Sequence, residues 1–249
     1  MPDIAGRFVG VGLYFDDLDR ARDFYTQTLG IPVSDEQVGR YAKLRGEAGF
    51  VRLERKGSET YPSQEKAVVL FEVPDLEAAI SVIGQEKFVH REPAWAVLHD
   101  PEGHNVLLLQ AGSERERPIE TDERKRFLLQ DHERRLPVQF VGIKLFFDDL
   151  DRASEFYGGV LGREADDDDP GCFVAYHVDP AGYFCLYHRE SPEDKAVLCF
   201  ETDDIDAADR AIGETRMTDR APRWAILEDP EGHWISIVQR VLPFSQCHG

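Results

Sequence analysis

The chain has 249 residues, of which 42% are hydrophobic and 31% charged, and its net charge is −19. This composition is typical of a folded globular protein. The excess of carboxylates argues against binding to nucleic acid or to an anionic membrane. It serves either to keep the protein soluble or to attract a cationic ligand. The sequence contains no apolar run near the ~18 residues of a membrane span and no signal-peptide pattern. We therefore expect a cytoplasmic protein whose four cysteines are reduced.

The sequence repeats itself in two blocks. The segment FVGVGLYFDDLDRARDFYTQTLG at 8–30 returns as FVGIKLFFDDLDRASEFYGGVLG at 140–162, with 15 of 23 residues identical. The segment WAVLHDPEGHNVLLLQ at 95–110 returns as WAILEDPEGHWISIVQ at 224–239. Two blocks that recur in the same order indicate a duplicated domain. The predicted organisation is a first domain at 1–112, a charged linker at 113–138 with a candidate helix at 121–135, and a second domain at 139–249.

In chain order, the first half alternates β-rich apolar runs with two amphipathic helices. Asp16, Asp17 and Asp75 are candidate helix caps, and Gly30 and Gly84 end the two helices. The predicted strands are 8–15, 40–45, 50–55, 67–73, 95–99 and 105–109, and the predicted helices are 18–29 and 76–83.

The second half repeats this order, with a strand at 141–147, a helix after Asp149 and a hairpin around 179–182. A strand at 196–202, a helix after Asp203 and two strands around 229–232 complete it. Each half thus predicts two βαβββ units, an α+β organisation. The aspartate run at 166–169 lacks the ligand spacing of a calcium loop, so a solvated loop is favoured there.

Two motifs resemble those of a known family. The opening strand followed by Asp-Leu-Asp-Arg-Ala, Phe-Tyr and Leu-Gly, and the Asp-Pro-Glu-Gly-His turn between two strands, resemble the vicinal oxygen chelate superfamily. This superfamily contains glyoxalase I, bleomycin-resistance proteins and extradiol dioxygenases. The resemblance covers both halves and implies four βαβββ modules that form two glyoxalase-like domains with cup-shaped mixed sheets. It is specific for the fold and weak for the activity, because one fold carries many chemistries.

The resemblance also locates the positions at which catalytic relatives hold a divalent metal on His, Gln or Glu. Apart from one thiol, the side chains at these positions are not ordinary metal ligands. We therefore expect no metal and no cofactor. The positions are Gly10, Arg52, Val68 and Leu107 in the first half and Gly142, Cys185, Val197 and Ser236 in the second.

The histidines offer two further interpretations. His104 and His233 follow the turn glycine in both halves, which favours a structural role at the hairpin. His177 and His188 lie on the two arms of one hairpin, where they form either an unusual metal or acid/base pair or two exposed strand-end side chains. Metal-free acid/base chemistry through Glu54, Lys144 or Tyr187 is a further alternative.

Strand alternation predicts the lining of each cup, including Phe8 and Phe140 at the strand starts. The leading hypothesis is a metal-independent protein, a monomer or homodimer, that binds a small aromatic or cationic molecule in one of its two apolar cups. The alternatives are an enzyme of the same superfamily, as a lyase, isomerase or dioxygenase, and a scaffold whose cups are filled. The predicted ligand-binding residues are Tyr14, Phe50, Arg52, Glu54, Lys144, Tyr183, Cys185, Tyr187, Trp234 and Ser236.

Overall fold

The computed structural model describes residues 4–46, 49–58, 67–113, 138–178, 182–191, 196–213 and 217–240. Its first half contains β1 (Arg7–Phe15), α1 (Leu18–Asp23), the π-helix η1 (Phe24–Thr28), β2 (Val33–Gln37), β3 (Tyr41–Gly46), β4 (Gly49–Arg55), β5 (Val68–Val73), α2 (Leu76–Ile83), the 3₁₀-helix η2 (Gln85–Lys87), β6 (Phe88–Glu92), β7 (Trp95–His99) and β8 (Asn105–Gln110). The predicted linker helix lies outside the described residues.

The second half repeats these elements. It contains β9 (Val138–Phe147), α4 (Leu150–Leu161), β10 (Asp167–Asp169), β11 (Phe173–Val178), β12 (Gly182–His188), β13 (Val197–Thr202), α5 (Ile205–Ile212), β14 (Met217–Ala221), β15 (Trp224–Glu228) and β16 (Trp234–Gln239). No helix among the described residues is long and apolar enough to cross a membrane.

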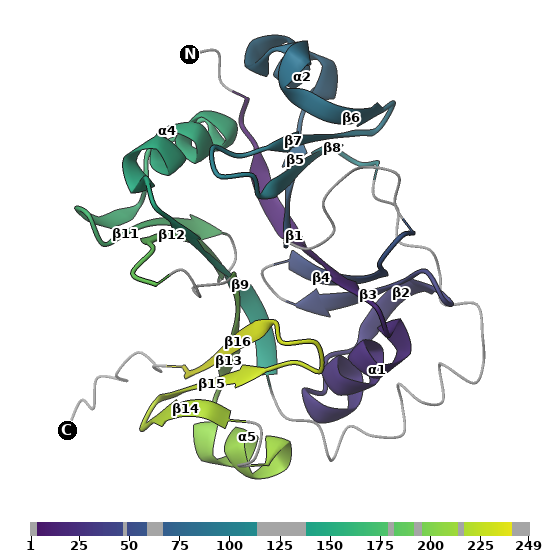
Figure 1. Cartoon of the computed structure of the whole chain (residues 1–249), viewed down its shortest axis with the longest axis vertical. Coiled ribbons are helices and arrows are strands. Elements are labelled where there is room, and N and C mark those ends of the chain that lie inside the picture. Colours follow the sequence, from purple (N-terminus) through teal and green to yellow (C-terminus); the bar gives the residue numbers. More distant parts are fainter. Residues whose placement is uncertain are drawn as a thin grey trace, which may run out of the picture.

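The strands form two mixed sheets of eight, one from each half (Figure 1). The order in the first sheet is β2-β3-β4-β1-β5-β8-β7-β6, and that in the second is β10-β11-β12-β9-β13-β16-β15-β14. Two consecutive βαβββ modules therefore build each cup-shaped sheet, with the opening strands of the two modules side by side at its centre. The predicted α+β class and the tandem βαβββ organisation are confirmed.

Aspartates begin the regular helices as the sequence predicts. The side chains of Asp17, Asp75 and Asp149 accept hydrogen bonds from the backbone N–H three residues later. The last helix begins one residue later than expected, because Asp204 is its cap. The first helix also differs, since it continues from Asp23 as a π-helix, whereas its copy α4 is α-helical throughout.

The sequence-based prediction omitted the outermost strands of both sheets. These are β2 and β6 in the first sheet and β10 and β14 in the second. Edge strands carry polar residues on both faces, so they show little of the alternation that identifies a half-buried strand. The prediction of a loop at 166–169 was wrong for Asp167–Asp169, because these exposed residues form a strand that pairs with β11.

A bulge shifts the register in both central strands. The pairing of β1 with β5 slips between Phe8 and Gly10, and that of β9 with β13 slips where Phe140 pairs with Phe200. An extra residue in one strand turns the side chains before it to the other face. Phe8 and Phe140 therefore belong to the central core, which corrects their predicted place in the cups.

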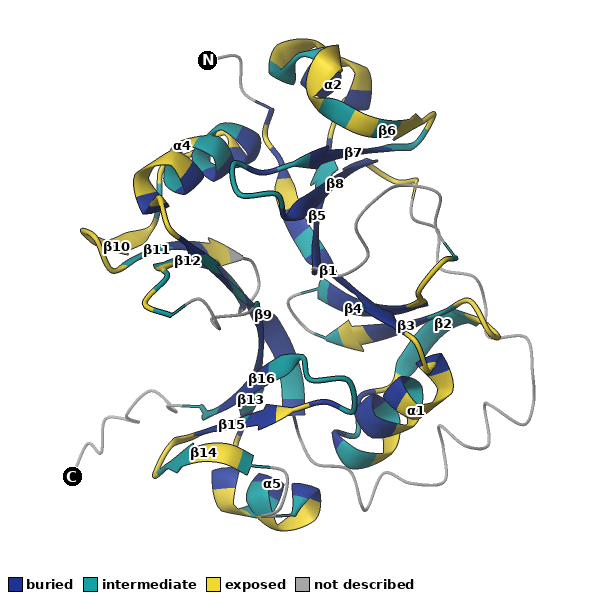
Figure 2. Cartoon of the chain, viewed as in Figure 1, coloured by how far each residue is buried: buried dark blue, intermediate teal, exposed yellow. Residues whose placement is uncertain are grey.

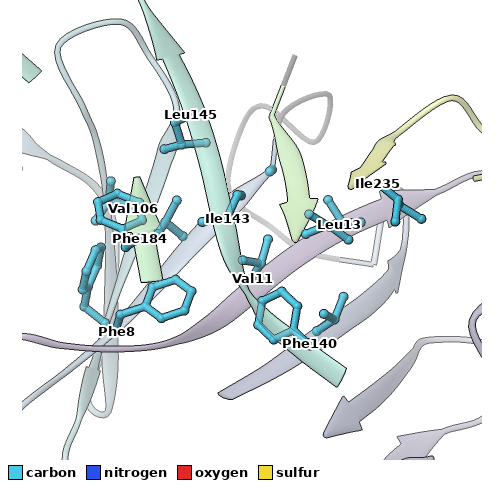
Figure 3. Close-up of a cluster of buried hydrophobic side chains, with 14 of the residues drawn as sticks. Phe8, Val11, Leu13, Val106, Phe140, Ile143, Leu145, Phe184 and Ile235 are labelled. Atoms are coloured by element: carbon cyan, nitrogen blue, oxygen red, sulfur yellow. The ribbon is translucent and has the colours of Figure 1, made fainter. Parts of the chain in front are cut away.

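One hydrophobic core joins the two halves. Figure 2 shows the buried residues concentrated along the central strands of both sheets. The ring of Phe8 stacks on that of Phe184 of the other half at 5.8 Å. Figure 3 shows side chains of both halves gathered in one cluster, including Phe8, Val11, Leu13, Val106, Phe140, Ile143, Leu145, Phe184 and Ile235.

The repeated Asp-Pro-Glu-Gly-His turns connect the two halves reciprocally. Asp100 accepts hydrogen bonds from the backbone N–H of His104 in its own turn (2.8 Å) and from the Tyr157 hydroxyl of the other half (2.9 Å). In the second turn, Asp229 accepts a hydrogen bond from the Tyr25 hydroxyl of the first half (3.0 Å). Each duplicated helix motif thus meets the duplicated turn of the other half.

The glutamate of each turn binds the start of the helix in the opposite half. Glu231 accepts hydrogen bonds from the backbone N–H groups of Asp16 (2.9 Å) and Asp17 (2.8 Å), and Glu102 accepts one from Asp149 (2.9 Å). A carboxylate at a helix N-terminus satisfies unpaired N–H groups and complements the helix dipole. In Figure 1, α1 accordingly lies beside β15 and β16 of the second sheet.

Candidate functional site: the inner faces of the two sheets

The face of each sheet turned away from the shared core is called its cup. Across the first cup, Arg52 pairs with Gly12, Gly12 with Val68, and Val68 with Asn105. The matching row of the second cup runs from Cys185 through Lys144 and Val197 to Trp234. The registers place Tyr14, Phe50, Arg52 and Glu54 in the first cup and Lys144, Tyr183, Cys185, Tyr187, Trp234 and Ser236 in the second.

The first cup is filled by its own side chains. Tyr14, Phe50 and Glu54 are 3%, 8% and 5% exposed, and an apolar cluster covers the neighbouring strands. The Arg52 Nε lies 2.6 Å from the Glu54 Oε1. The Lys43 ammonium, itself buried, lies 4.0 Å from the centre of the Phe50 ring. These long charged side chains occupy the volume that a ligand would need.

The second cup is more open. Its counterparts of Tyr14, Phe50 and Glu54 are Phe146, Tyr183 and Tyr187, and all three are partly exposed. The ring of Tyr187 lies 5.8 Å from that of Phe146 and is stacked at 5.7 Å on that of Phe173. The result is a partly accessible aromatic surface on the inner face of the sheet.

Small residues explain the difference between the cups. In the first cup, Lys43 and Arg52 pair across β3 and β4, whereas the matching pair on β11 and β12 is Ala175 and Cys185. The cation of the second cup instead comes from Lys144 on the central strand, where the first cup has Gly12. Two long side chains of the first cup are thus replaced by a methyl and a thiol on the strands next to Lys144.

The protonation states in the second cup follow from burial. Burial raises the pKa of the Cys185 thiol and that of the Tyr187 hydroxyl, each to about 12. Burial also raises the pKa of the Cys199 thiol and of the Tyr183 hydroxyl. All four groups are neutral near pH 7, and a reactive thiolate requires the opposite shift.

The family's metal positions lie in the two cups, and their residues do not fit a metal. The first-half positions carry Gly10, Arg52, Val68 and Leu107, which offer no lone pair suited to a divalent cation. The second-half positions offer one neutral thiol and one hydroxyl. Within the described residues, no group of three or more His, Cys, Asp or Glu side chains could hold a metal ion.

Backbone geometry excludes a side chain at two of these positions, Gly10 and Gly142 on the opening strand of each half. A Cβ on Gly142, where φ is +151°, would lie 1.8 Å from the carbonyl oxygen of Tyr183. A Cβ on Gly10 would lie 2.3 Å from the carbonyl oxygen of Phe50. A histidine or glutamine therefore cannot replace either glycine unless the strand moves.

The structure distinguishes between the roles predicted for the two pairs of histidines, His177 with His188 and His104 with His233. On β12, Tyr183 and Tyr187 face the cup, and His177 pairs with Tyr183. His188 pairs with Phe147, so it lies on the opposite face, and the suggested pair with His177 is wrong. His104 has the structural environment expected at the turn, with Nδ1 2.9 Å from Asp100 Oδ2, and the same contact of His233 with Asp229 measures 2.8 Å.

Three residues of the second cup were not predicted from the sequence. Phe173 pairs with Tyr187, Trp224 with Val238 and Ile226 with Ser236, so all three face the cup. Trp224 is 38% exposed. Trp224 and Ile226 could have been identified from the sequence. They alternate along the strand at 224–228, which pairs with the strand that carries Ser236.

A cavity of about 520 Å³ lies on another face of the molecule, between α4 and the β10–β11 edge. Five carboxylates belong to its lining, from Asp151, Glu155, Glu164, Asp168 and Asp169. The guanidinium in its wall, Arg163, is already paired with Asp166 at 3.1 Å. Its lining includes Phe173 at the edge of the second sheet but not Lys144, Tyr183, Tyr187 or Trp234.

Comparisons with known proteins agree with this architecture. The sequence model of the Glyoxalase/Bleomycin resistance protein/Dioxygenase superfamily matches residues 7–107. Among solved structures, a variant of homoprotocatechuate 2,3-dioxygenase from Brevibacterium fuscum is 19% identical, with 97% of this chain and 73% of that chain aligned and a TM-score of 0.67. The Arthrobacter globiformis enzyme of that name is 18% identical, with 96% and 80% aligned and a TM-score of 0.64.

A complex of the Brevibacterium fuscum enzyme with 3,4-dihydroxyphenylacetate is 18% identical, with 97% of this chain and 82% of that chain aligned and a TM-score of 0.65. A search of curated proteins finds no match. The two cups built from paired βαβββ modules define the class of protein, a tandem vicinal oxygen chelate fold. Residues 7–107 belong to the glyoxalase, bleomycin resistance and dioxygenase superfamily, whose sequence model matches them, and the second half of the chain repeats their motifs.

Proposed function

We propose that this protein binds a small aromatic molecule in its second cup, without a metal. The observation that carries the proposal is the contrast between the cups. The first is filled by buried side chains, whereas the second presents partly exposed aromatic rings around Lys144. Aromatic side chains with a few polar groups on a concave face are typical of small-molecule sites.

The energetics favour a flat ligand. Each aromatic pair contributes about 0.5–1.5 kcal/mol beyond the burial of apolar area. A planar molecule on the inner face of β9 and β12 can contact Phe146, Tyr183 and Tyr187, and one over β15 and β16 can contact Trp224 and Trp234. Two or three such contacts account for micromolar binding once the apolar area is added.

The three tryptophans of the chain provide a direct test. Trp224 and Trp234 line the second cup, and Trp95 occupies in the first cup the position of Trp224 in the second. Saturating titration with a panel of aromatic compounds is expected to quench the fluorescence of wild-type protein and of Trp95→Phe. The double variant Trp224→Phe/Trp234→Phe, which keeps only Trp95, is expected to show little quenching. Equal quenching of this double variant, or no quenching of wild type by any compound, would contradict the proposal.

Metal independence has its own test. Elemental analysis of protein purified without chelators is expected to find no stoichiometric transition metal, and ligand binding is expected to survive EDTA. No metal is expected because the positions occupied by Gly10, Val68 and Leu107 offer no ligand. Stoichiometric Fe, Mn, Ni or Zn would overturn this part of the proposal.

An enzyme of the same superfamily is the second candidate. It is favoured by the similarity in fold to homoprotocatechuate 2,3-dioxygenases over nearly the whole chain. The suggested acid/base residues do not form one set, because Glu54 lies in the first cup and Lys144 and Tyr187 lie in the second. Oxygen consumption with 3,4-dihydroxyphenylacetate and added Fe²⁺ tests this candidate. Turnover with a ring-cleaved product would establish it over binding alone.

A further inference from the structure

Lys144 occupies the centre of the second cup. It lies on β9 between Cys185 of β12 and Val197 of β13, and it is partly exposed. Its ammonium lies 5.4 Å from the centre of the Tyr187 ring. No ion pair joins it to another residue in the part of the chain that the structure describes. Among the described residues, the positive charge on this face of the cup therefore has no counter-ion.

The carboxylates that share this face of the sheet have other partners or lie at its edge. Glu201 lies 3.2 Å from the Arg240 guanidinium, and Glu228 accepts a hydrogen bond from the Trp234 indole at 2.9 Å. Asp167 and Asp169 are exposed on the edge strand β10, which β11 and β12 separate from β9, and Asp219 is exposed on the opposite edge strand β14. None of these groups neutralises Lys144.

The polar groups nearer to Lys144 on the cup face are uncharged. Burial raises the pKa of Cys185 and of Tyr187 to about 12, so neither supplies an anion near neutral pH. The pKa of Cys199 is also raised by burial. The inner face of the second cup thus carries a local positive charge at its centre, opposite in sign to the −19 of the whole chain.

We infer that the ligand of the second cup is an aromatic anion whose carboxylate, sulfonate or phosphate pairs with Lys144. This inference rests on the proposed function and specifies its ligand class. A ligand that covers Lys144 removes water from the ammonium, and an anionic group compensates for that loss better than a neutral group does. The charge-assisted contact also fixes the ligand's orientation, with the ring against the aromatic side chains. The net charge of the chain suggests a cationic ligand, whereas the local charge of Lys144 favours an anionic one.

Matched probes test the sign of the ligand charge on the full chain. The affinities of benzoate, 4-hydroxyphenylacetate and 2-naphthoate are compared with those of their neutral amides, and 2-naphthoate also with 2-naphthyltrimethylammonium. The best carboxylate is expected to bind wild-type protein about tenfold or more tightly than its amide, a difference of about 1.4 kcal/mol. Raising the ionic strength is expected to reduce this preference.

Two variants separate the charge from the shape of the side chain. Lys144→Met keeps much of the length and removes the charge, so the carboxylate preference is expected to vanish while the amide affinity stays within about threefold. Lys144→Arg keeps the charge and is expected to retain the preference. The melting temperature of each variant is checked, and because Lys144 is partly exposed, both are expected to fold.

The outcomes distinguish this inference from the proposed function. Equal affinity for carboxylates and amides, tighter binding of the ammonium compound, or an unchanged preference in Lys144→Met would overturn the inference while the cup remained a binding site. Failure of every aromatic probe to bind would overturn the proposed function and the inference together.

Discussion

Single residues explain why the duplicated motifs persist in both halves. Tyr25 and Tyr157 are buried, and each donates its hydroxyl hydrogen to an aspartate of the opposite turn. Burial raises the pKa of both tyrosines, and the neighbouring aspartate charge adds to the effect. The tyrosines therefore stay protonated and act as permanent donors.

Replacing one such tyrosine measures the strength of this link between the halves. Tyr25→Phe removes a buried hydrogen bond to Asp229 and is expected to lower the free energy of unfolding by about 1–3 kcal/mol, measured by urea denaturation. Tyr41→Phe is the control, because its hydroxyl bonds Asp35 of the same half at a partly buried site. A loss from Tyr25→Phe no larger than that from the control would contradict the reciprocal link.

The turn aspartate predicts a dependence of stability on pH. Burial raises the pKa of Asp100, but hydrogen bonds from His104 and Tyr157 together with the His104 charge outweigh it, so the pKa lies below its usual 3.8. A lowered pKa contributes stability that is complete above the unfolded value and is lost as the pH falls below 3.8 toward the folded value. In that range wild type is expected to lose more stability than Asp100→Asn does. Parallel pH profiles of the two proteins would argue against this assignment.

Gly142, at a position where relatives hold a metal, predicts a contrast in stability between two glycine substitutions. Gly142→Ala is expected to cost about 2 kcal/mol or more, because the new Cβ would clash with the Tyr183 carbonyl oxygen. Gly12→Ala is the matched control, since its Cβ would meet Val68 at an ordinary 3.5 Å. Equal stability of the two variants would show that the strand adapts and that a histidine there remains possible.

At the scale of elements, the helix starts depend on the opposite half. Glu231 binds the N-terminus of α1, and Glu102 binds that of α4. Glu231→Ala is expected to cost about 1 kcal/mol and to speed hydrogen exchange at the start of α1. Glu92→Ala is the control, because Glu92 contacts His90 at an exposed site on the strand β6, away from any helix start. If exchange at α1 does not change, the contact contributes nothing to the helix.

The elements also show what sequence alone can predict. Strands buried on one or both faces, such as β5 and β8, were located within a residue or two because apolar runs and turn signals bound them. The edge strands were missed because exposed residues such as Asp167–Asp169 follow no alternation. The bulge that moves Phe8 and Phe140 out of the cups depends on pairing between distant strands, which local patterns do not contain.

The same limits apply to the candidate site. Alternation assigned Lys144, Tyr187 and Trp234 to one face, and the registers bring them together. The sequence did not show which cup is filled, because that depends on Lys43 and Arg52 reaching across neighbouring strands. The role of the repeated Asp-Pro-Glu-Gly-His turn also required the structure, since its partners come from the other half of the chain.

At the scale of the whole molecule, the shared core predicts cooperative unfolding. Phe8, Phe140 and Phe184 belong to one cluster that contains residues of both halves. Calorimetry of the intact chain is expected to show one transition whose van't Hoff and calorimetric enthalpies agree. Residues 1–113 alone are expected not to reach the native fold, because they leave this core exposed. Two separated transitions, or a stable monomeric first half, would contradict a common core.

Mapping a bound ligand by amide chemical shifts tests the central claim most directly. Titration of ¹⁵N-labelled protein with the tightest aromatic carboxylate is expected to shift amides of β9, β12, β13 and β16 around Lys144, while β1, β4, β5 and β8 stay unchanged. Shifts confined to the first sheet or to the cavity between α4 and β10, or no saturable shift at all, would contradict a binding site in the second cup.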